Sequence, residues 1–111
     1  ADNWLRHVRD VHEKHGALIE QCPADLRYDR LCELNAMEQA LTVCQTTVVQ
    51  DAWERQQPVT VHAWVYGLDN GQLHDLGFTV SSPQDVRIRY AATLQLISAR
   101  IRSADSVDNT R

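Results

Sequence analysis

The chain has 111 residues, of which 43% are apolar and 23% are charged. These values are close to those of an ordinary globular domain, so they exclude a disordered, collagen-like or multidomain protein. No stretch approaches about eighteen uninterrupted apolar residues, and the N-terminus carries neither a basic nor an apolar leader segment. We therefore expect neither a membrane span nor secretion.

The net charge is −4, and the excess of acids lies entirely in residues 1–57. Proteins that bind nucleic acids normally carry a basic surface, so we expect no nucleic-acid partner for this acidic chain. The chain has an odd number of cysteines, and no two of them are close in the sequence: Cys22, Cys32 and Cys44. They do not make a disulfide framework and suit a reducing compartment, which favours a cytoplasmic location.

The first half of the chain is predicted to be helical. Apolar residues at helical spacing indicate an amphipathic helix from Asn3 to about Leu18, with a break at Gly16. Pro23, which is tolerated in the first turn of a helix, then begins a second helix over about 23–34. A mostly buried third helix is expected from Asn35 to about residue 53, although residues 46–49 would equally suit a short strand.

The second half predicts a hairpin and one helix. β-Branched and aromatic residues indicate strands over 59–66 and 72–80, joined by a turn containing Asn70-Gly71. Pro83 begins a last helix, whose apolar face is formed by Val86, Tyr90, Leu94, Ile97 and Ile101. Residues 103–111 contain one branched aliphatic residue, Val107, and are expected to form a flexible tail. Because two strands make a marginal sheet, strands outside this chain should complete it.

The sequence contains few candidates for a metal-binding or catalytic site. His12 and His15 share a face of the first helix and imidazole suits Zn²⁺, but His7 is poorly spaced, so a solvated polar face is the alternative. Closed zinc motifs, glycine-rich phosphate loops and a Gly-x-Ser-x-Gly elbow are absent from the sequence. Cys32 and Cys44 lie in apolar helical runs, which favours inert buried thiols over nucleophiles.

Two groups of polar residues interrupt the apolar pattern. Glu33, Asn35 and Gln39 surround the predicted junction of two helices, and His62 and Trp64 lie on the first strand. Taken alone, both groups favour a structural role, in which buried polar side chains satisfy helix ends and loop backbone.

Several stretches together resemble the C-terminal half of a β-class carbonic anhydrase, especially of the bacterial subgroup. They are Asn3-Trp4-Leu5-Arg6-His7-Val8-Arg9-Asp10, His15-Gly16, Leu31-Cys32-Glu33-Leu34-Asn35-Ala36-Met37-Glu38-Gln39, Ala52-Trp53-Glu54-Arg55, and Val61-His62-Ala63-Trp64-Val65-Tyr66-Gly67-Leu68-Asp69-Asn70-Gly71-Gln72-Leu73-His74-Asp75-Leu76. Their order and spacing match the family from Asn3 to about Ile97. The sequence departs from the family pattern at Ala36, where Val is usual, at Ala63, where Gly is usual, and at Gln57, where Gly-Gln or Gly-Lys is commoner.

The resemblance implies an α/β fold in which residues 1–102 are the C-terminal part of one domain and residues 103–111 a flexible tail. Helices, the β-hairpin and the last helix would complete a mainly parallel sheet. The implied parent is a lyase that interconverts CO2 and bicarbonate at zinc, with the zinc ligands upstream of this segment and no catalytic or metal-binding residue within it. The resemblance also implies a homodimer or tetramer.

One functional residue follows from the resemblance. Tyr66 matches the tyrosine that binds a regulatory bicarbonate in the allosteric subgroup, and the alternative is a strand tyrosine bonded to backbone or water. The other motif residues are expected to be mainly structural: Trp4, Glu33, Asn35, Gln39, His62, Trp64, Asp69 and Gly71. Two further hypotheses are an inactive remnant that acts as an oligomerisation or interaction module and, more weakly, a metal binder based on His12 and His15.

Overall fold

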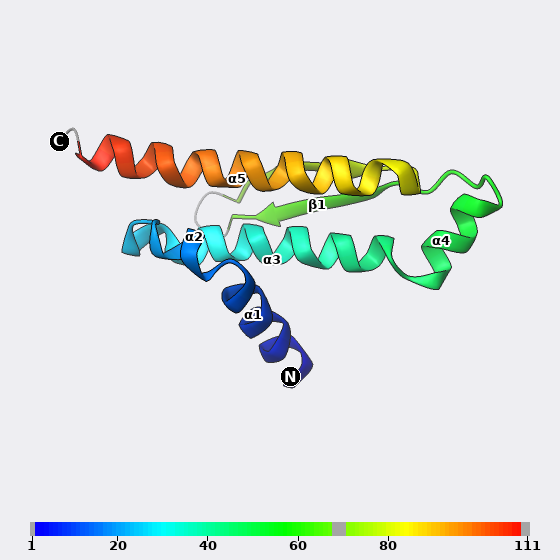
Figure 1. The fold of residues 1–111 in the computed structure, drawn as a ribbon, viewed down its shortest axis with the longest axis horizontal. Coiled ribbons are helices and arrows are strands. Elements are labelled where there is room, and N and C mark those ends of the chain that lie inside the picture. The colour runs from blue at the N-terminus through cyan, green and yellow to red at the C-terminus, as the bar shows by residue number, and fades with distance from the viewer. Residues whose placement is uncertain (1, 68–70, 110–111) are drawn as a thin grey trace.

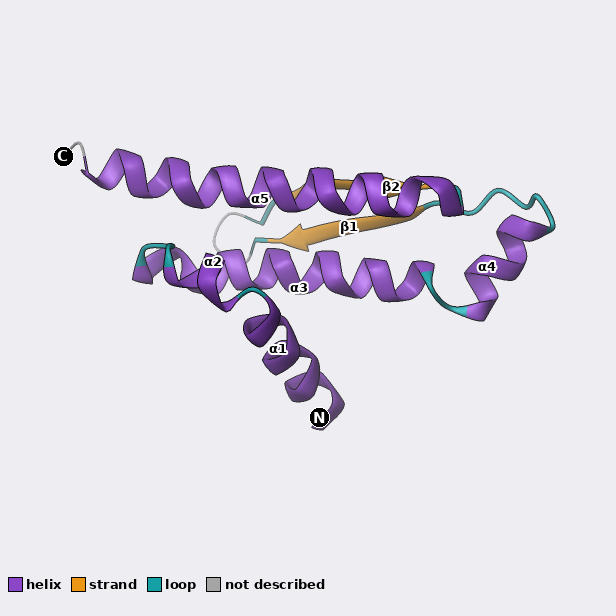
Figure 2. Cartoon of the chain, viewed as in Figure 1, coloured by secondary structure: helices purple, strands orange, loops and turns teal. Residues whose placement is uncertain are grey.

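The computed structural model describes residues 2–67 and 71–109. Helices make up most of the described chain, and a single antiparallel hairpin supplies its strands (Figure 2). The elements are α1 (Asp2–Lys14), α2 (Gly16–Glu20), the 3-10 turn η1 (Ala24–Leu26), α3 (Arg27–Cys44), α4 (Thr47–Glu54), β1 (Val61–Tyr66), β2 (Leu73–Val80), the 3-10 turn η2 (Pro83–Asp85) and α5 (Val86–Asn109).

The hairpin forms one layer and the long helices α3 and α5 form the other. β1 packs mainly on α3, β2 mainly on α5, and the two helices also contact each other. Figure 1 shows α3 and α5 running alongside the hairpin, while α1 leaves this body at an angle. The alternation of buried and exposed residues along β1 follows from this arrangement, because a two-layer structure buries only one face of the sheet.

The predicted hairpin is confirmed, with an irregular register. Val61 lies opposite Val80, but Trp64 lies opposite Asp75, so the register shifts between these pairs. Gly77 occupies the irregularity with φ of 84°, a left-handed conformation that residues with a Cβ rarely adopt. Its N–H is bound by the Asp75 carboxylate, with Oδ1 at 2.9 Å. The expected pairing with strands outside this chain stays a prediction.

The helix boundaries differ from the predicted ones in two places. The break near Gly16 is confirmed, since α1 ends at Lys14 and α2 begins at Gly16. The predicted junction at 34–35 is wrong, because α3 continues through it to Cys44. The chain breaks later, where the Thr46 side chain caps α4 by accepting a hydrogen bond from the Val49 N–H. This cap also decides the helix-or-strand alternative at 46–49 in favour of helix.

The last helix begins after η2, as Pro83 predicts, and continues to Asn109. The helix therefore does not end at Arg102, where the flexible tail was expected to begin. The division into residues 1–102 and a flexible tail 103–111 stays a prediction.

The core lies between the two layers. Its fully buried side chains come from both: Leu34, Met37 and Cys44 of α3, Phe78 and Val80 of β2, and Thr93, Ile97 and Ile101 of α5. Burial of this apolar surface is the main stabilising contribution to such a fold. Within the described part of the chain, no helix combines the length and apolarity needed to cross a membrane.

The end of α4 supplies a test of backbone strain. Gln56 has φ of 61°, and the N–H groups of Gln56 and Gln57 bind the carbonyls of Trp53 and Ala52. This is the hydrogen-bonding pattern of a helix C-terminus at which glycine is favoured. A side chain in this conformation costs about 1–2 kcal/mol.

We expect Gln56→Gly to raise the free energy of unfolding by about 0.5–1 kcal/mol, because relief of strain exceeds the entropy that glycine adds to the unfolded chain. The measurement is equilibrium denaturation by urea. Gln45→Gly is the matched control, since Gln45 follows α3 with an ordinary φ of −88° and glycine should bring no gain there. An equal response of the two variants would contradict the strain argument.

Candidate functional site

Tyr66 is the last residue of β1, and its side chain is 59% exposed. It lies opposite Leu73 across the hairpin. Gly71, with φ of 66°, is close enough to the phenol that a Cβ there would lie 3.6 Å from the Tyr66 hydroxyl. Glycine at 71 therefore suits the left-handed backbone conformation, whereas a Cβ would make only an ordinary contact with the hydroxyl.

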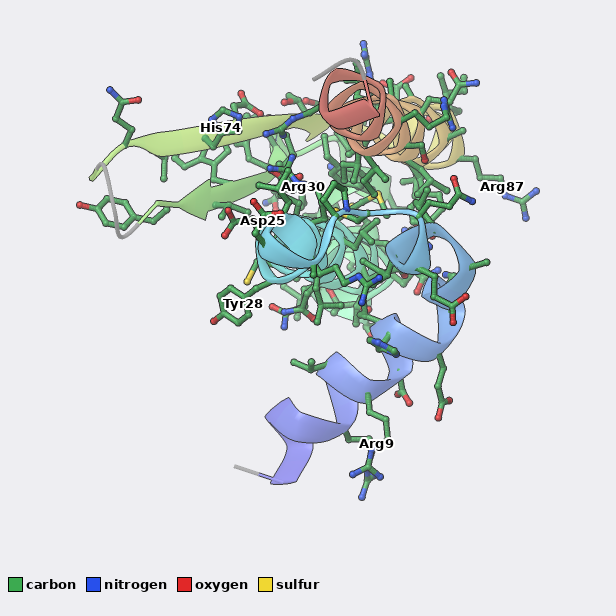
Figure 3. The ribbon with its side chains drawn as sticks, turned by 90° about the vertical axis from the view of Figure 1, so that its left-hand side faces the viewer. Arg9, Asp25, Tyr28, Arg30, His74 and Arg87 are labelled. Atoms are coloured by element: carbon green, nitrogen blue, oxygen red, sulfur yellow. The ribbon has the colours of Figure 1, made fainter. Side chains whose placement is uncertain are left out.

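Tyr66 lines a hollow of about 490 Å³ between the hairpin, α3 and α5. We call it the Tyr66 hollow. Figure 3 shows Arg30 between α3 and the hairpin, with His74 on the β2 side and Tyr28 on α3. Its walls are formed by Tyr28, Asp29, Arg30, Cys32, Glu33, Val65, Tyr66, Gly67, Gln72, His74 and Arg100. The hairpin, α3 and α5, which are distant in sequence, therefore meet beside Tyr66, the one residue to which the resemblance assigned a ligand.

Glu33 holds the inner wall of the hollow together. Its carboxylate is buried and accepts hydrogen bonds from Arg30 Nη1, at 3.0 and 3.3 Å, and from Arg100 Nη1, at 2.7 Å. Arg30 is itself mostly buried, whereas the side chain of Arg100 is 40% exposed. The interpretation that Glu33 satisfies a helix end is wrong, because Glu33 lies inside α3 and pairs with two guanidinium groups.

The charges around the hollow nearly balance. Arg30 and Arg100 bring two positive charges, Glu33 brings one negative charge, and Asp29 on the exposed side brings another. The Arg30 Nε is buried and has no hydrogen-bond partner among the described residues. An anion in the hollow would find donors in the guanidinium groups of Arg30 and Arg100, and Tyr66 lies at the rim.

The remaining motif residues do not gather at this hollow. Asn35 and Gln39 line a separate depression between α1 and α3, where the buried Asn35 Oδ1 lacks a partner among the described residues. His62 and Trp64 lie on the exposed face of β1 with ring centroids 5.3 Å apart, and His62 Nδ1 lies 3.2 Å from Thr79 Oγ1.

The side chain of Trp4 and the whole of Asp69 lie outside the part of the chain that the structure describes.

The two most deeply buried thiols, those of Cys22 and Cys44, are poor nucleophiles. Burial raises the pKa of the Cys22 thiol and of the Cys44 thiol, so both stay protonated at neutral pH. Cys32 is half-buried and lines the Tyr66 hollow. The interpretation of Cys44 as an inert buried thiol agrees with this burial.

Zinc ligands do not come together in the described residues. No group of three or more His, Cys, Asp or Glu side chains there could hold a metal ion. His12 is exposed, whereas His15 is buried and turned toward Glu38, so this pair gives the metal-binder hypothesis no support. The donor set of the described chain therefore does not fit a zinc site.

Sequence reasoning missed the two arginines that bind Glu33, Arg30 and Arg100. Arg30 carried a signal, because Arg and Glu three residues apart on a helix are neighbours. Arg100 carried none, since it approaches Glu33 only after α5 has packed beside α3.

Glu33→Gln tests how far the hollow depends on this carboxylate. The change keeps the shape of the side chain but leaves the mostly buried Arg30 without a counter-charge, so we expect the free energy of unfolding to fall by about 3 kcal/mol. Urea denaturation measures it. Glu20→Gln, at an exposed position, should change it by less than about 0.5 kcal/mol. Equal effects of the two changes would contradict the role of Glu33.

Comparisons with known proteins place this arrangement in a family. The family model described as Carbonic anhydrase matches residues 1–73. A carbonic anhydrase of Emericella nidulans is 40% identical over 74 residues, which cover 66% of this chain and 32% of the relative. The chain thus spans about a third of that relative.

A solved structure is similar over a longer stretch. It is the Coccomyxa β-carbonic anhydrase in complex with acetazolamide, which matches with a TM-score of 0.71 and 34% identity over 77% of this chain and 38% of the solved chain. The backbone likeness supports the α/β fold expected for part of such a domain. Family match, sequence identity and backbone likeness agree that this chain belongs to the β class of the carbonic anhydrase family.

Proposed function

We propose that this chain is the C-terminal part of a longer β-carbonic anhydrase that interconverts CO2 and bicarbonate. The observation that carries the proposal is the backbone likeness to the Coccomyxa enzyme, at 34% identity over 77% of the chain. The proposed parent is a cytoplasmic homodimer or tetramer.

Zinc in this proposal is bound by segments outside the chain. The described residues offer no zinc ligand set, so we assign them no step at the metal. Their contribution is structural support and the Tyr66 hollow. A reading frame that encodes Cys-x-Asp-x-Arg and His-x-x-Cys immediately upstream would support the enzyme, and its absence would count against it.

Tyr66 is proposed to bind a regulatory bicarbonate. Its hydroxyl can donate a hydrogen bond to an anion, and it lines the same hollow as Arg30 and Arg100. The high exposure of its side chain leaves the phenol accessible to a ligand.

A second candidate function is an inactive oligomerisation or interaction module. The exposed face of the hairpin favours it, because Trp64, Tyr66 and Leu73 are each at least half exposed. Apolar side chains gathered on one exposed face are typical of protein-binding surfaces. The two candidates differ in activity once the upstream segments are present.

The 111-residue chain by itself should bind no stoichiometric zinc and should hydrate CO2 no faster than buffer, because metal binding needs a complete ligand set. Metal analysis and stopped-flow CO2 hydration measure the two properties. One tightly held zinc per chain together with measurable hydration would overturn the assignment of the ligands to other segments.

In the longer enzyme, Tyr66→Phe should weaken inhibition by bicarbonate and leave turnover at low bicarbonate unchanged. A hydrogen bond to a charged group contributes about 1.5–3 kcal/mol, so the inhibitory concentration should rise roughly tenfold to a hundredfold. The measurement is CO2 hydration against bicarbonate concentration. Tyr28→Phe is the control, since Tyr28 lines the same hollow and is 72% exposed. Unchanged bicarbonate sensitivity in Tyr66→Phe would leave Tyr66 as a structural strand residue.

A further inference from the structure

The side chain of Glu38 joins three parts of the molecule. Glu38 lies on α3 and is 15% exposed. Its Oε1 accepts a hydrogen bond from Lys14 Nζ at 3.1 Å, and its Oε2 lies 2.9 Å from His15 Nε2 and also accepts a hydrogen bond from the Tyr90 hydroxyl. Lys14 ends α1, His15 links α1 to α2, and Tyr90 belongs to α5. We call these four residues the Glu38 cluster.

The cluster lies where α1 joins the body. Figure 1 shows α1 leaving the α3 layer at an angle from this junction. Val11 is the one buried residue among the α1 side chains that the structure describes, and it lies three residues before Lys14. The described attachment of α1 therefore includes Val11 and the contacts of Lys14 and His15, and Val8 is half-buried.

The charges of the cluster favour an ionised Glu38. Burial by itself would raise the pKa of the Glu38 carboxyl, but the hydrogen bonds from Tyr90, His15 and Lys14 together lower it below the ordinary 4.5. The Tyr90 pKa is raised, by burial and by its hydrogen bond to Glu38. The Lys14 pKa is also raised, by Tyr90 first and by Glu38 in addition, against the opposing effect of burial.

We propose that Glu38 is an acid-sensitive latch that holds α1 against α3 and α5 while it is ionised and releases α1 when it is protonated. The proposal concerns the fold and does not depend on the proposed activity. Protonation removes the one negative charge that Lys14, His15 and Tyr90 share. The Lys14 ammonium group then loses the carboxylate that binds it, and the Tyr90 hydroxyl and the His15 ring lose their charged partner.

Among the side chains that the structure describes, Asp10 of α1 is a further titratable group beside the cluster. It lines the same depression as Lys14 and Glu38. No hydrogen bond or ion pair joins it to either residue among the described contacts. The described contacts therefore give Lys14 no second carboxylate partner beside Glu38.

The direction of the pH dependence follows from the lowered pKa. A carboxyl group whose pKa is lower in the docked state stabilises docking fully above its ordinary value of 4.5. This stabilisation is lost as the pH falls through the lower docked value. At the alkaline end, the raised pKa values of Lys14 and Tyr90 give stability below their ordinary values that is lost as the pH rises through the docked ones. Release at neutral pH is therefore not expected.

Amide hydrogen exchange of the full chain tests the latch, with protection factors corrected for the intrinsic rate at each pH. At pH 7 the amides of residues 8–14 should be protected, and on acidification below about pH 4 their protection should fall about tenfold to a hundredfold. Amides of α3 and α5 should keep their protection over the same range. Loss of protection in all helices at one pH, or no protection of residues 8–14 at pH 7, would overturn the proposal.

Two variants separate a latch from a structural contact. Glu38→Gln should lower the protection of residues 8–14 at pH 7 and abolish the acid transition. Tyr90→Phe keeps the carboxylate but removes one donor, so the transition should move to higher pH, toward the ordinary carboxyl value. This second variant keeps the proposal falsifiable if Glu38→Gln does not fold.

Glu13→Gln is the matched control, because Glu13 lies on α1 with an exposed side chain. Its acid transition should equal that of the unchanged chain. A transition at the same pH in the unchanged chain and in Tyr90→Phe would show that Glu38 does not set it, and would overturn the proposal.

Discussion

Burial of only one face of the hairpin is the constraint on which the rest of the structure depends. Phe78 and Val80 of β2 are fully buried against α3 and α5, where Leu34 and Ile97 meet them in the same core. Because strand side chains alternate, burial of this face directs the aromatic residues of β1 to the other side. The exposed position of Tyr66, and with it the site proposed for an anion, follows from the packing of the apolar side chains on the opposite face of the hairpin.

Helix α3 organises the polar contacts through two carboxylates. Glu33 and Glu38 are five residues apart, so they point about 140° away from each other around the helix. Glu33 pairs with Arg100, and Glu38 accepts a hydrogen bond from Tyr90, so both carboxylates bind α5. Glu33 also binds Arg30 within α3, and Glu38 also binds Lys14 at the end of α1. The Tyr66 hollow and the α1 junction therefore share one helix as their scaffold. This arrangement explains how a chain with a single hairpin holds several helices in place.

The motif residues that this chain shares with the β class lie at three different places in the structure. Glu33 and Tyr66 line one hollow, whereas Asn35 and Gln39 lie on the α1 side and His62 and Trp64 on the exposed sheet face. A motif that is continuous in sequence is therefore distributed over three surfaces. Of the two motif residues beside the cavity, Glu33 is paired with its guanidinium groups, and Tyr66 is the one proposed to meet a ligand.

The sequence by itself determined the hairpin, the start of the last helix and the family, because strand alternation, Asn70-Gly71, Pro83 and the motifs are local signals. It misplaced the junction at 34–35, since no local residue shows that α3 runs on to Cys44 against β1 and α5. Only the tertiary structure decided what the carboxylates of α3 do. Arg100 and Tyr90 approach them from a helix more than fifty residues away, and such long-range polar contacts leave no periodicity in the chain.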